Sequence, residues 1–355
     1  DVARVFTGHK EREIITRIDG REAVEIAIYK EGGTNTVTVV DATRNVPLRT
    51  FDVGSTPSGL AINPSTASLY VATQSGLEIY DTSNYSKTNT STVSYYGRQV
   101  TFTVDDRYGI STGNGGVSVF NISSGSLIAE TAVGAGARGI GVHPTDPSVF
   151  YVANRDDDSV SQVTMQNYTD PSSLTLSTTR IGLDANSGPQ GAAVDSSGDY
   201  LYIAANGSAD GSVGGALYTL DLNSTPPQVV DRYAPNLQGY PSSPVAPFHP
   251  TGVTVGPGDG LLYLAYNVFA TADGRGPHVE AFQPNNGSPA SLGSPVIVDS
   301  DAQLNTTVVG QFVGPDCASC PTAPPPVVES DYVRPASTGP LAGLLLLLLR
   351  LRRRR

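Results

Sequence analysis

A short phrase recurs along this chain, and its spacing constrains the fold more than any other feature of the sequence. One copy comprises three largely apolar segments at 57–62, 69–72 and 77–81, and its last segment has counterparts at 37–41 and 117–121. The counterparts follow one another at intervals of 40 residues. A unit of this size cannot bury its apolar faces alone, so neighbouring copies must stack against each other. The sequence therefore predicts a repeat architecture.

Later copies keep the same order of segments, at 138–163, 190–204 and 251–265. The copies have recognisable ends near Asp41, Asp81, Asn121, Gln162, Asp221 and Phe282. Each copy is expected to form a strand, a turn, a strand, a hairpin and a third strand, and in the copy that begins at 57 the segment 93–96 is expected to be the fourth. Four short strands about every 40 residues are typical of one blade of a β-propeller.

The chain is therefore predicted to be all-β, a β-propeller of four-stranded antiparallel blades, of which six are recognisable in the sequence. A seventh blade is expected where segments from the two ends, 2–6 and 306–312, share one sheet, because such closure removes exposed edges. The composition agrees, since 38 glycines, 26 prolines and only 15% charged residues favour many short strands and turns.

The charge of the chain bears on its partners. The formal net charge is −11 even with the arginines at the carboxyl end included. Binding to nucleic acid needs clustered Lys and Arg to neutralise phosphates, and no basic patch precedes that end. We therefore expect no nucleic-acid partner, and we expect a monomer. Because the first residue is Asp and no charged and apolar leader follows, we expect a mature or truncated product.

Three tyrosine segments match a known repeat motif: Tyr-Val-Ala-Asn at 151–154, Tyr-Val-Ala-Thr at 70–73 and Tyr-Ile-Ala-Ala at 202–205. With the preceding Pro-x-Gly strands, the region from about 20 to 300 resembles the YVTN family of seven-bladed β-propellers. The resemblance implies the fold. It leaves the function open, because propellers carry many unrelated activities.

The copies spread apart beyond residue 160, since Tyr151, Tyr202 and Tyr263 are separated by 51 and 61 residues. Four predicted insertions account for the spread, at 167–187, 206–215, 235–248 and 270–277. Insertions in repeat proteins gather in loops, often on the binding face, but exposed loops also drift without function. Both interpretations stay open.

The composition changes after 312, which predicts a propeller at 1–315, a linker at 316–340 and a tail at 341–355. The proline-rich stretch at 321–326 cannot join a central strand. In the tail, the leucines from Leu344 to Leu349 precede an arginine cluster that includes Arg352 and Arg355. An apolar run this short does not span the roughly 30 Å of a bilayer core.

This order of segments resembles the tripartite carboxyl-terminal sorting signals of bacteria, such as the GlyGly-CTERM, PEP-CTERM and MYXO-CTERM tails. The resemblance implies a sorting protease as partner, arginines on the cytoplasmic side, and a propeller at the cell surface or in the periplasm. An artefactual end or an ordinary short amphipathic anchor is the alternative.

Few residues suggest chemistry. Cys317 and Cys320 lie in the linker, where Pro321 stands in place of the His of a haem motif, so we expect a local disulfide in an exported protein. Two cysteines supply only half of a zinc site. The carboxylates Asp156, Asp157 and Asp158 are a candidate calcium site, with solvated loop charge as the alternative.

Three side chains are expected near inner strands and are candidates for ligand binding: Arg98, Arg138 and His249. A histidine in a satisfied turn is the alternative for His249. No hydrolase elbow, phosphate loop or zincin helix occurs. We therefore expect a non-catalytic binding or scaffold module that recognises protein or carbohydrate at the cell surface through loops on one face, without a cofactor unless calcium binds.

The alternative is an enzyme that resembles the propeller lactonases, in which polar residues at the channel mouth hydrolyse a lactone. A cluster of His, Glu, Asp or Arg that converges at one mouth of the channel would favour this alternative. Quinone and haem redox propellers are disfavoured, because the chain has no Trp and lacks the haem motif.

Overall fold

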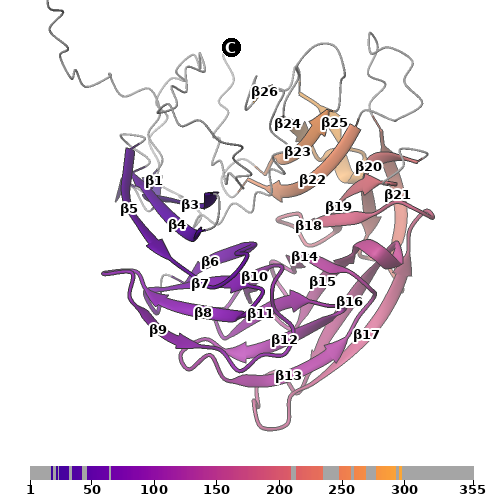
Figure 1. The fold of residues 1–355 in the computed structure, drawn as a ribbon. Coiled ribbons are helices and arrows are strands. Elements are labelled where there is room, and N and C mark those ends of the chain that lie inside the picture. Colours follow the sequence, from indigo (N-terminus) through magenta and orange to yellow (C-terminus); the bar gives the residue numbers. More distant parts are fainter. Residues whose placement is uncertain are drawn as a thin grey trace, which may run out of the picture.

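The computed structural model describes residues 17–18, 21–22, 24–31, 34–41, 46–63, 65–208, 213–234, 248–256, 260–268, 277–292 and 296–297. These residues form six antiparallel sheets arranged around a common centre, together with a separate pair formed by β1 (Arg17–Ile18) and β2 (Arg21–Glu22) (Figure 1). We number the six sheets as blades 1 to 6 in chain order.

The blades contain the following elements. Blade 1 has β3 (Val24–Glu31), β4 (Thr34–Asp41) and β5 (Val46–Asp52), and blade 2 has β6 (Gly59–Asn63), β7 (Ser68–Thr73), β8 (Gly76–Asp81) and β9 (Lys87–Thr90). Blade 3 has β10 (Val100–Phe102), β11 (Tyr108–Gly113), β12 (Gly116–Asn121) and β13 (Leu127–Ala132). Blade 4 has β14 (Ala137–Val142), β15 (Val149–Asn154), the 3-10 helix η1 (Arg155–Asp157), β16 (Ser159–Gln166) and β17 (Thr175–Gly182).

Blade 5 has β18 (Pro189–Val194), β19 (Tyr200–Gly207), β20 (Gly214–Asp221) and β21 (Gln228–Tyr233). Blade 6 has β22 (Phe248–Val255), β23 (Leu262–Val268), β24 (Pro277–Gln283), η2 (Asn285–Gly287), β25 (Ala290–Ser291) and β26 (Val296–Ile297), and both β25 and β26 pair with β24. Blades 2 to 5 therefore have the predicted four strands, and the prediction of an all-β propeller is confirmed. The segments proposed for a seventh blade, 2–6 and 306–312, lie outside the described residues.

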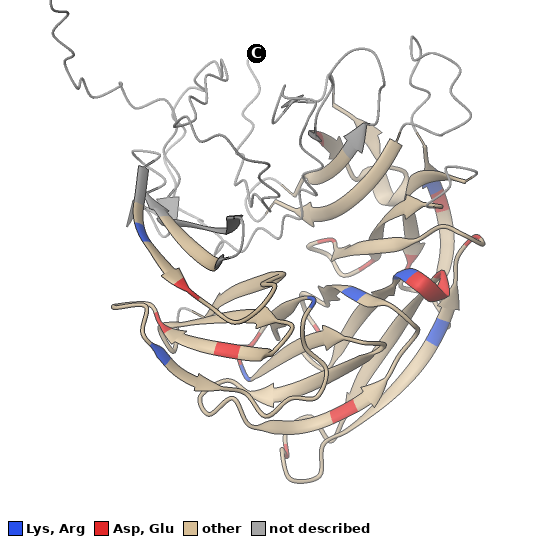
Figure 2. Cartoon of the chain, in the orientation of Figure 1, with Lys and Arg blue, Asp and Glu red and all other residues tan. Residues whose placement is uncertain are grey.

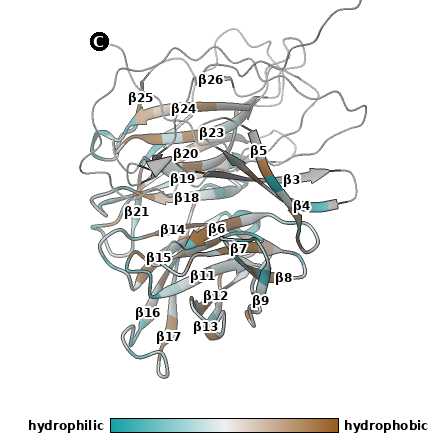
Figure 3. Ribbon diagram, turned by 90° about the vertical axis from the view of Figure 1, so that its left-hand side faces the viewer, coloured by the Kyte–Doolittle hydropathy of each residue, from teal (hydrophilic) through white to brown (hydrophobic). Residues whose placement is uncertain are grey.

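Apolar residues fill the spaces between blades rather than one face of each sheet. Figure 3 shows the sheets stacked side by side, with brown apolar segments within their strands. One cluster joins Tyr151 and Val160 of blade 4 to Leu201, Ile203 and Tyr218 of blade 5. A blade covered on both sides buries both faces of its middle strands, which explains why those strands do not alternate between apolar and polar residues.

The glycine of the Pro-x-Gly segments has a structural reason. A Cβ on Gly59 would lie 2.4 Å from the Arg98 carbonyl oxygen, and one on Gly139 would lie 2.5 Å from that of Gln190. One on Gly191 would lie 3.0 Å from Cα of Gly252. The inner strands of neighbouring blades thus meet backbone to backbone, and only glycine permits that approach.

Three sequence-based assignments of local structure were wrong. The fourth strand of blade 2 is β9, whereas 93–96 lies in a turn and loop. The third strand of blade 4 continues to Gln166, four residues beyond the predicted end at Gln162. The predicted insertion 167–187 contains β17, the outer strand of that blade. The outer strands β9 and β17 are exposed and polar, so they carry little apolar pattern that a sequence can reveal.

Of the other predicted insertions, 206–215 includes the end of β19 and the start of β20, where Gly207 pairs with Gly214, whereas residues 209–212, 235–247 and 269–276 lie outside the described part of the chain. Within that described part, no helix is long and apolar enough to cross a bilayer. Cys317, Cys320 and the arginine-ended tail also lie outside it.

Candidate functional site

The strand order brings five equivalent residues to one mouth of the central channel. In an antiparallel blade, the start of the first strand and the hairpin between the second and third strands lie at the same edge. We call this edge of all blades the mouth face. Equivalent residues of the repeat, each at or near the start of an inner strand, form what we call the mouth ring: Ser58, Arg98, Arg138, Gln190 and Thr251. The first three of these residues are 40 residues apart, so their shared position follows from the repeat.

Hydrogen bonds between blades fix the two arginines of the ring. The Ser58 hydroxyl donates to the Arg98 carbonyl oxygen at 3.0 Å, and the Thr112 hydroxyl donates to that of Arg138 at 2.7 Å. The backbone N–H of Ile140 donates to Oε1 of Gln99 at 2.8 Å. The backbone of both arginines is therefore tied to the neighbouring blades before any ligand arrives.

Arg138 has unsatisfied hydrogen-bonding capacity. Its Nη1 donates to Oε1 of Gln190 at 3.4 Å, but its buried Nε has no hydrogen-bond partner. A buried donor without a partner costs about 1–3 kcal/mol, which makes this placement unfavourable for folding alone.

Like charges surround the same side chain. Burial and, to a smaller extent, the nearby charges of Arg98 and Arg155 lower the pKa of Arg138 to about 10, while Asp156 acts in the opposite direction. We call Arg98, Arg138 and Arg155 the arginine trio. Arg155 forms an ion pair with Asp156 at 3.3 Å, so one of the three cations has a carboxylate partner.

Helix η1 delivers Arg155 to the mouth face. The backbone N–H groups of Arg155 and Asp156 donate to the carbonyl oxygens of Gly136 and Ala135, both at 3.1 Å, which anchors η1 beside the start of β14. In Figure 2, η1 shows its basic residue directly next to its acidic ones.

Two half-buried tyrosines, Tyr95 and Tyr96, precede Arg98 in the loop that enters blade 3. The Tyr95 backbone N–H donates to the Ser118 hydroxyl at 3.1 Å, and its carbonyl oxygen accepts from the Ser111 hydroxyl at 2.7 Å. This loop is therefore fixed to blade 3, where the Tyr95 ring lies over Gly116 and Tyr96 packs against the apolar cluster between blades 2 and 3.

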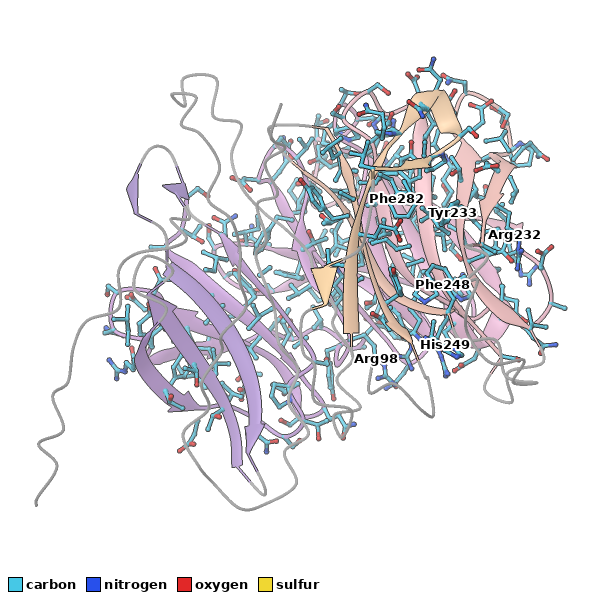
Figure 4. The ribbon with its side chains drawn as sticks, turned by 90° about the horizontal axis from the view of Figure 1, so that it is seen from above. Arg98, Arg232, Tyr233, Phe248, His249 and Phe282 are labelled. Carbon is cyan, nitrogen blue, oxygen red and sulfur yellow. The ribbon has the colours of Figure 1, made fainter. Side chains whose placement is uncertain are left out.

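The structure brings Arg98 and Arg138 together, but it gives His249 a different setting. Viewed from above, Arg98 and His249 lie toward the same face of the molecule, and Arg232 lies toward its outer side (Figure 4). His249 is buried, and its Nδ1 lies 2.9 Å from the Asn206 carbonyl oxygen, which accepts a hydrogen bond from it. His249 thus joins the β19–β20 hairpin of blade 5 to β22.

The three carboxylates predicted as a calcium site each bind a different protein group. Asp156 pairs with Arg155, and Asp157 Oδ2 accepts from Arg180 Nε at 2.8 Å. The carboxylate of Asp158 accepts from the backbone N–H groups of Asn186 and Gly188 at 2.7 and 3.0 Å. The described residues contain no group of three or more His, Cys, Asp or Glu side chains that could hold a metal ion.

A second basic region lies on the outer flank between blades 4 and 5. It surrounds a groove of about 520 Å³ whose lining includes Arg180, Asp184, Tyr218 and Arg232. Tyr218 donates to Asp184 at 2.9 Å, Arg232 lies 3.4 Å from the same carboxylate, and its guanidinium stacks 5.6 Å from the centroid of the tyrosine ring. The arginines of this groove bind carboxylates, unlike Arg138.

The sequence had indicated Arg98 and Arg138 but neither Arg155 nor Gln190. Gln190 precedes Gly191 just as Arg138 precedes Gly139, so the repeat contained the signal for it. Arg155 reaches the site through η1, and no sequence pattern predicted that helix.

Comparisons with known proteins address the fold. No protein-family model and no curated protein matches the chain. A functionally unknown protein from Desulfotomaculum acetoxidans is similar in structure with a TM-score of 0.59 and 12% identity, over 78% of this chain and 82% of that one.

Two further solved structures are similar. One, described as a "putative 6-phosphogluconolactonase" from Bacteroides fragilis, has a TM-score of 0.58 and 13% identity over 78% of this chain and 81% of that one. Hydrazine synthase of Kuenenia stuttgartiensis has a TM-score of 0.51 and 20% identity over 67% of this chain and 78% of that one. At these identities the likeness shows the propeller fold alone.

Proposed function

We propose that this protein is an extracytoplasmic β-propeller that acts as a non-catalytic binding module and recognises protein or carbohydrate at the cell surface through the mouth face. The observation that carries this proposal is the half-buried Arg138, which lies among like charges and whose guanidinium donates to Gln190 through Nη1 while its Nε has no partner. The repulsion from Arg98 and Arg155 costs folding free energy, and an anionic group of a bound partner near these arginines would offset it.

The proposed extracytoplasmic location rests on the carboxyl-terminal tail at 341–355. The short apolar run and arginine cluster at 341–355 support a bacterial sorting signal, and the Tyr-Val-Ala-Asn segment at 151–154 supports a YVTN-type repeat. Expressing the chain with and without 341–355 and following its size and cell fraction tests the first point. Equal size and location of both forms would overturn it.

Retention on envelope material tests the binding role. The full chain, an Arg98→Gln/Arg138→Gln double variant and an Arg180→Gln control would be applied to immobilised protein and polysaccharide fractions of a bacterial envelope. We expect one fraction to retain the wild type and the control but not the double variant. Equal retention of all three, or of none, would contradict a binding role of this face.

The lactonase-like alternative is supported by the same cations, because arginines can stabilise the oxyanion of an opening lactone ring. Hydrolysis also needs a base, and Asp156 is the carboxylate that lies beside the trio, where it pairs with Arg155. Incubation of the protein with five- and six-membered lactones distinguishes the two functions. Ring opening that the double variant abolishes would replace the binding proposal with the enzymatic one.

A further inference from the structure

We infer that the protein carries N-linked glycans on the face opposite the mouth, attached to the side-chain amides of Asn84, Asn121 and Asn286. The inference rests on the extracytoplasmic location proposed above, and it goes beyond the binding function because it assigns a modification to the other face. Each of these asparagines belongs to an Asn-x-Ser motif, the acceptor pattern for N-glycosylation of exported proteins.

The three asparagines occupy the same turn in three different blades. Asn84 lies between β8 and β9, Asn121 ends β12 before β13, and Asn286 lies in η2 between β24 and β25. Each is thus in the turn between the third and fourth strands of its blade. In an antiparallel blade this turn lies at the edge opposite the hairpin between the second and third strands. Because that hairpin belongs to the mouth face, all three asparagines lie on the opposite face.

The fold does not use the amides of these three side chains. Asn84 and Asn286 are exposed and Asn121 is half-buried, and none of their Nδ2 atoms donates a hydrogen bond to a residue that the structure describes. The serines two positions further on are exposed as well, and their hydroxyls make no hydrogen bond to a described residue: Ser86, Ser123 and Ser288. Both side-chain groups of the motif are therefore open to solvent.

The other Asn-x-Ser/Thr motifs of the described residues have bound amides. In each of them Nδ2 donates to an oxygen of another residue at a distance between 2.8 and 3.3 Å: Asn89, Asn167, Asn206 and Asn223. In the motif of Asn89 the Ser91 hydroxyl is bound too, since it donates to the Gly125 carbonyl oxygen. A transferase reaches such an amide only after its hydrogen bond breaks. Asn206 is the member of this group that lies on the mouth face, at the end of β19.

Turn chemistry explains only part of the motif. Oδ1 of Asn84 accepts the Ser86 N–H at 2.8 Å, a bond that stabilises the turn. Oδ1 of Asp170 accepts the Ser172 N–H in the same way at 3.0 Å, so the turn does not require an amide. There the Ser172 hydroxyl also donates to the carboxylate, at 2.7 Å, whereas the Ser86 hydroxyl makes no such bond. The fold therefore accounts for the side-chain oxygen of Asn84, but neither for its amide nitrogen nor for the hydroxyl of Ser86.

The modification joins the anomeric carbon of a sugar to Nδ2 of the asparagine. The donor is an oligosaccharide linked to a lipid diphosphate. The bond between its anomeric carbon and the diphosphate oxygen breaks, and the diphosphate leaves with the electron pair. Nδ2 forms the new bond and loses one proton, so the step needs no oxidant or reductant. The glycans cover the face opposite the mouth and leave the mouth face open to the proposed partner.

Peptide mass spectrometry tests the inference on the full chain, isolated from the envelope and from the cytoplasm of the cells that naturally produce it. We expect the envelope protein to carry glycans on Asn84, Asn121 and Asn286 and to be unmodified at Asn89. Envelope protein without glycans at the three positions would overturn the inference and leave the proposed location intact. Unmodified protein that is confined to the cytoplasm would overturn both. Glycans as frequent on Asn89 as on Asn84 would show that open amides do not select the sites.

Variants in one turn test the role of the motif. Ser86→Ala removes the hydroxyl and should abolish the glycan on Asn84, whereas Ser86→Thr keeps the motif and should keep the glycan. Ser83→Ala, one position before Asn84, is the matched control and should be modified like the wild type. Because the Ser86 hydroxyl makes no hydrogen bond to a described residue, thermal unfolding of both Ser86 variants should match the wild type. A glycan on Asn84 that survives Ser86→Ala would refute attachment through the motif.

The double variant of the mouth separates this inference from the proposed binding role. Arg98→Gln/Arg138→Gln should keep the glycans on all three asparagines while it loses retention on envelope material. Loss of the glycans together with retention would contradict the assignment of the two properties to opposite faces. Glycans that persist while retention is unchanged would support this inference and contradict the binding role of the mouth.

Discussion

The channel mouth and the outer flank between blades 4 and 5 both carry arginines, but only the flank gives them carboxylate partners throughout. On the flank, Arg180 lies 2.8 Å from Asp157 and Arg232 lies 3.4 Å from Asp184. At the mouth, Arg138 faces Arg98 and Arg155 instead. Charges that stabilise a fold are paired, whereas charges held in an unfavourable setting are typical of functional sites. The difference supports our proposal that the mouth face, rather than the flank, binds a partner.

The largest effect is expected from a change that prevents the mouth from forming. In Gly139→Ala the new Cβ would lie 2.5 Å from the Gln190 carbonyl oxygen and 2.8 Å from Cα of Gly191, both backbone atoms. The inner strands of blades 4 and 5 must then separate, and we expect a loss of several kcal/mol, at or above the roughly 1–3 kcal/mol typical of overpacking. Denaturant unfolding measures the loss.

Gly182→Ala on β17 is the matched control, because its Cβ would meet only the flexible end of Arg180 at 3.5 Å. It should leave the free energy of unfolding almost unchanged. If the two alanine variants were equally stable, the backbone contact between inner strands would not explain the glycine of the repeat.

Two glutamates at equivalent positions of blades 2 and 6 show how hydrogen-bond partners change the pKa of a buried carboxyl group. Glu78 is buried, but hydrogen bonds from Lys87 at 2.5 Å, Gly54 N–H at 2.7 Å and Tyr80 at 2.9 Å outweigh burial and lower its pKa. Burial raises the pKa of Glu280, although Tyr266 and Ser291 donate to it. The ionised form is thus favoured in blade 2 and penalised in blade 6.

We expect Glu78→Gln to destabilise the protein at pH 7 by about 1–3 kcal/mol, because it leaves buried donors with a weaker acceptor. Glu280→Gln should be neutral or slightly stabilising. Since the pKa of Glu78 is lowered on folding, its contribution is complete above its ordinary value of 4.5 and disappears as the pH falls through the lower folded value. Thermal unfolding between pH 3 and pH 7 measures the stability of both variants. If both lost the same stability at pH 7, the difference in hydrogen-bond partners between Glu78 and Glu280 would not matter for stability.

Arg138→Gln should change the free energy of unfolding in the opposite direction from Glu78→Gln. It removes a charge that its neighbours repel, so we expect the folded state to gain up to about 1 kcal/mol while ligand binding is lost. The pKa of Arg138 falls from 12.5 to about 10 on folding, so the penalty is complete below pH 10 and shrinks as the pH rises beyond it. A variant that unfolds at a lower temperature than wild type at pH 7 would show that Arg138 serves the fold instead.

The sequence predicted the scaffold well because the residues that build it are the repeated ones. Strands β4, β8, β12 and β20 end at the predicted residues, Asp41, Asp81, Asn121 and Asp221. The outer strands escaped prediction, because exposed threonines and serines such as those of β17 form strands through pairing with β16 rather than through an apolar pattern.

The mouth was predictable only in part. Arg98 and Arg138 follow the 40-residue period, whereas Gln190 lies 52 residues beyond Arg138 and Arg155 lies in η1 rather than in a repeated segment. Which of these arginines lacks a partner depends on contacts between blades, and no spacing along the chain encodes such contacts. The sequence could therefore name candidate residues for the mouth, but the structure was needed to show that Arg138 is half-buried among like charges.

The smallest effect on stability is expected from a substitution on the outer flank between blades 4 and 5. Arg180→Gln removes an exposed ion pair, in which Asp157 raises the pKa of the arginine through a hydrogen bond. Exposed pairs contribute little to stability and are screened by salt, so the shift in Tm should be small, of destabilising sign, and absent at high ionic strength. Because Arg180 has a carboxylate partner, we expect retention of the protein on envelope material to be unchanged. A loss of affinity in Arg180→Gln as large as that in Arg138→Gln would show that the ligand responds to the general positive charge of blade 4, and the contrast between paired and unpaired arginines would no longer locate the site.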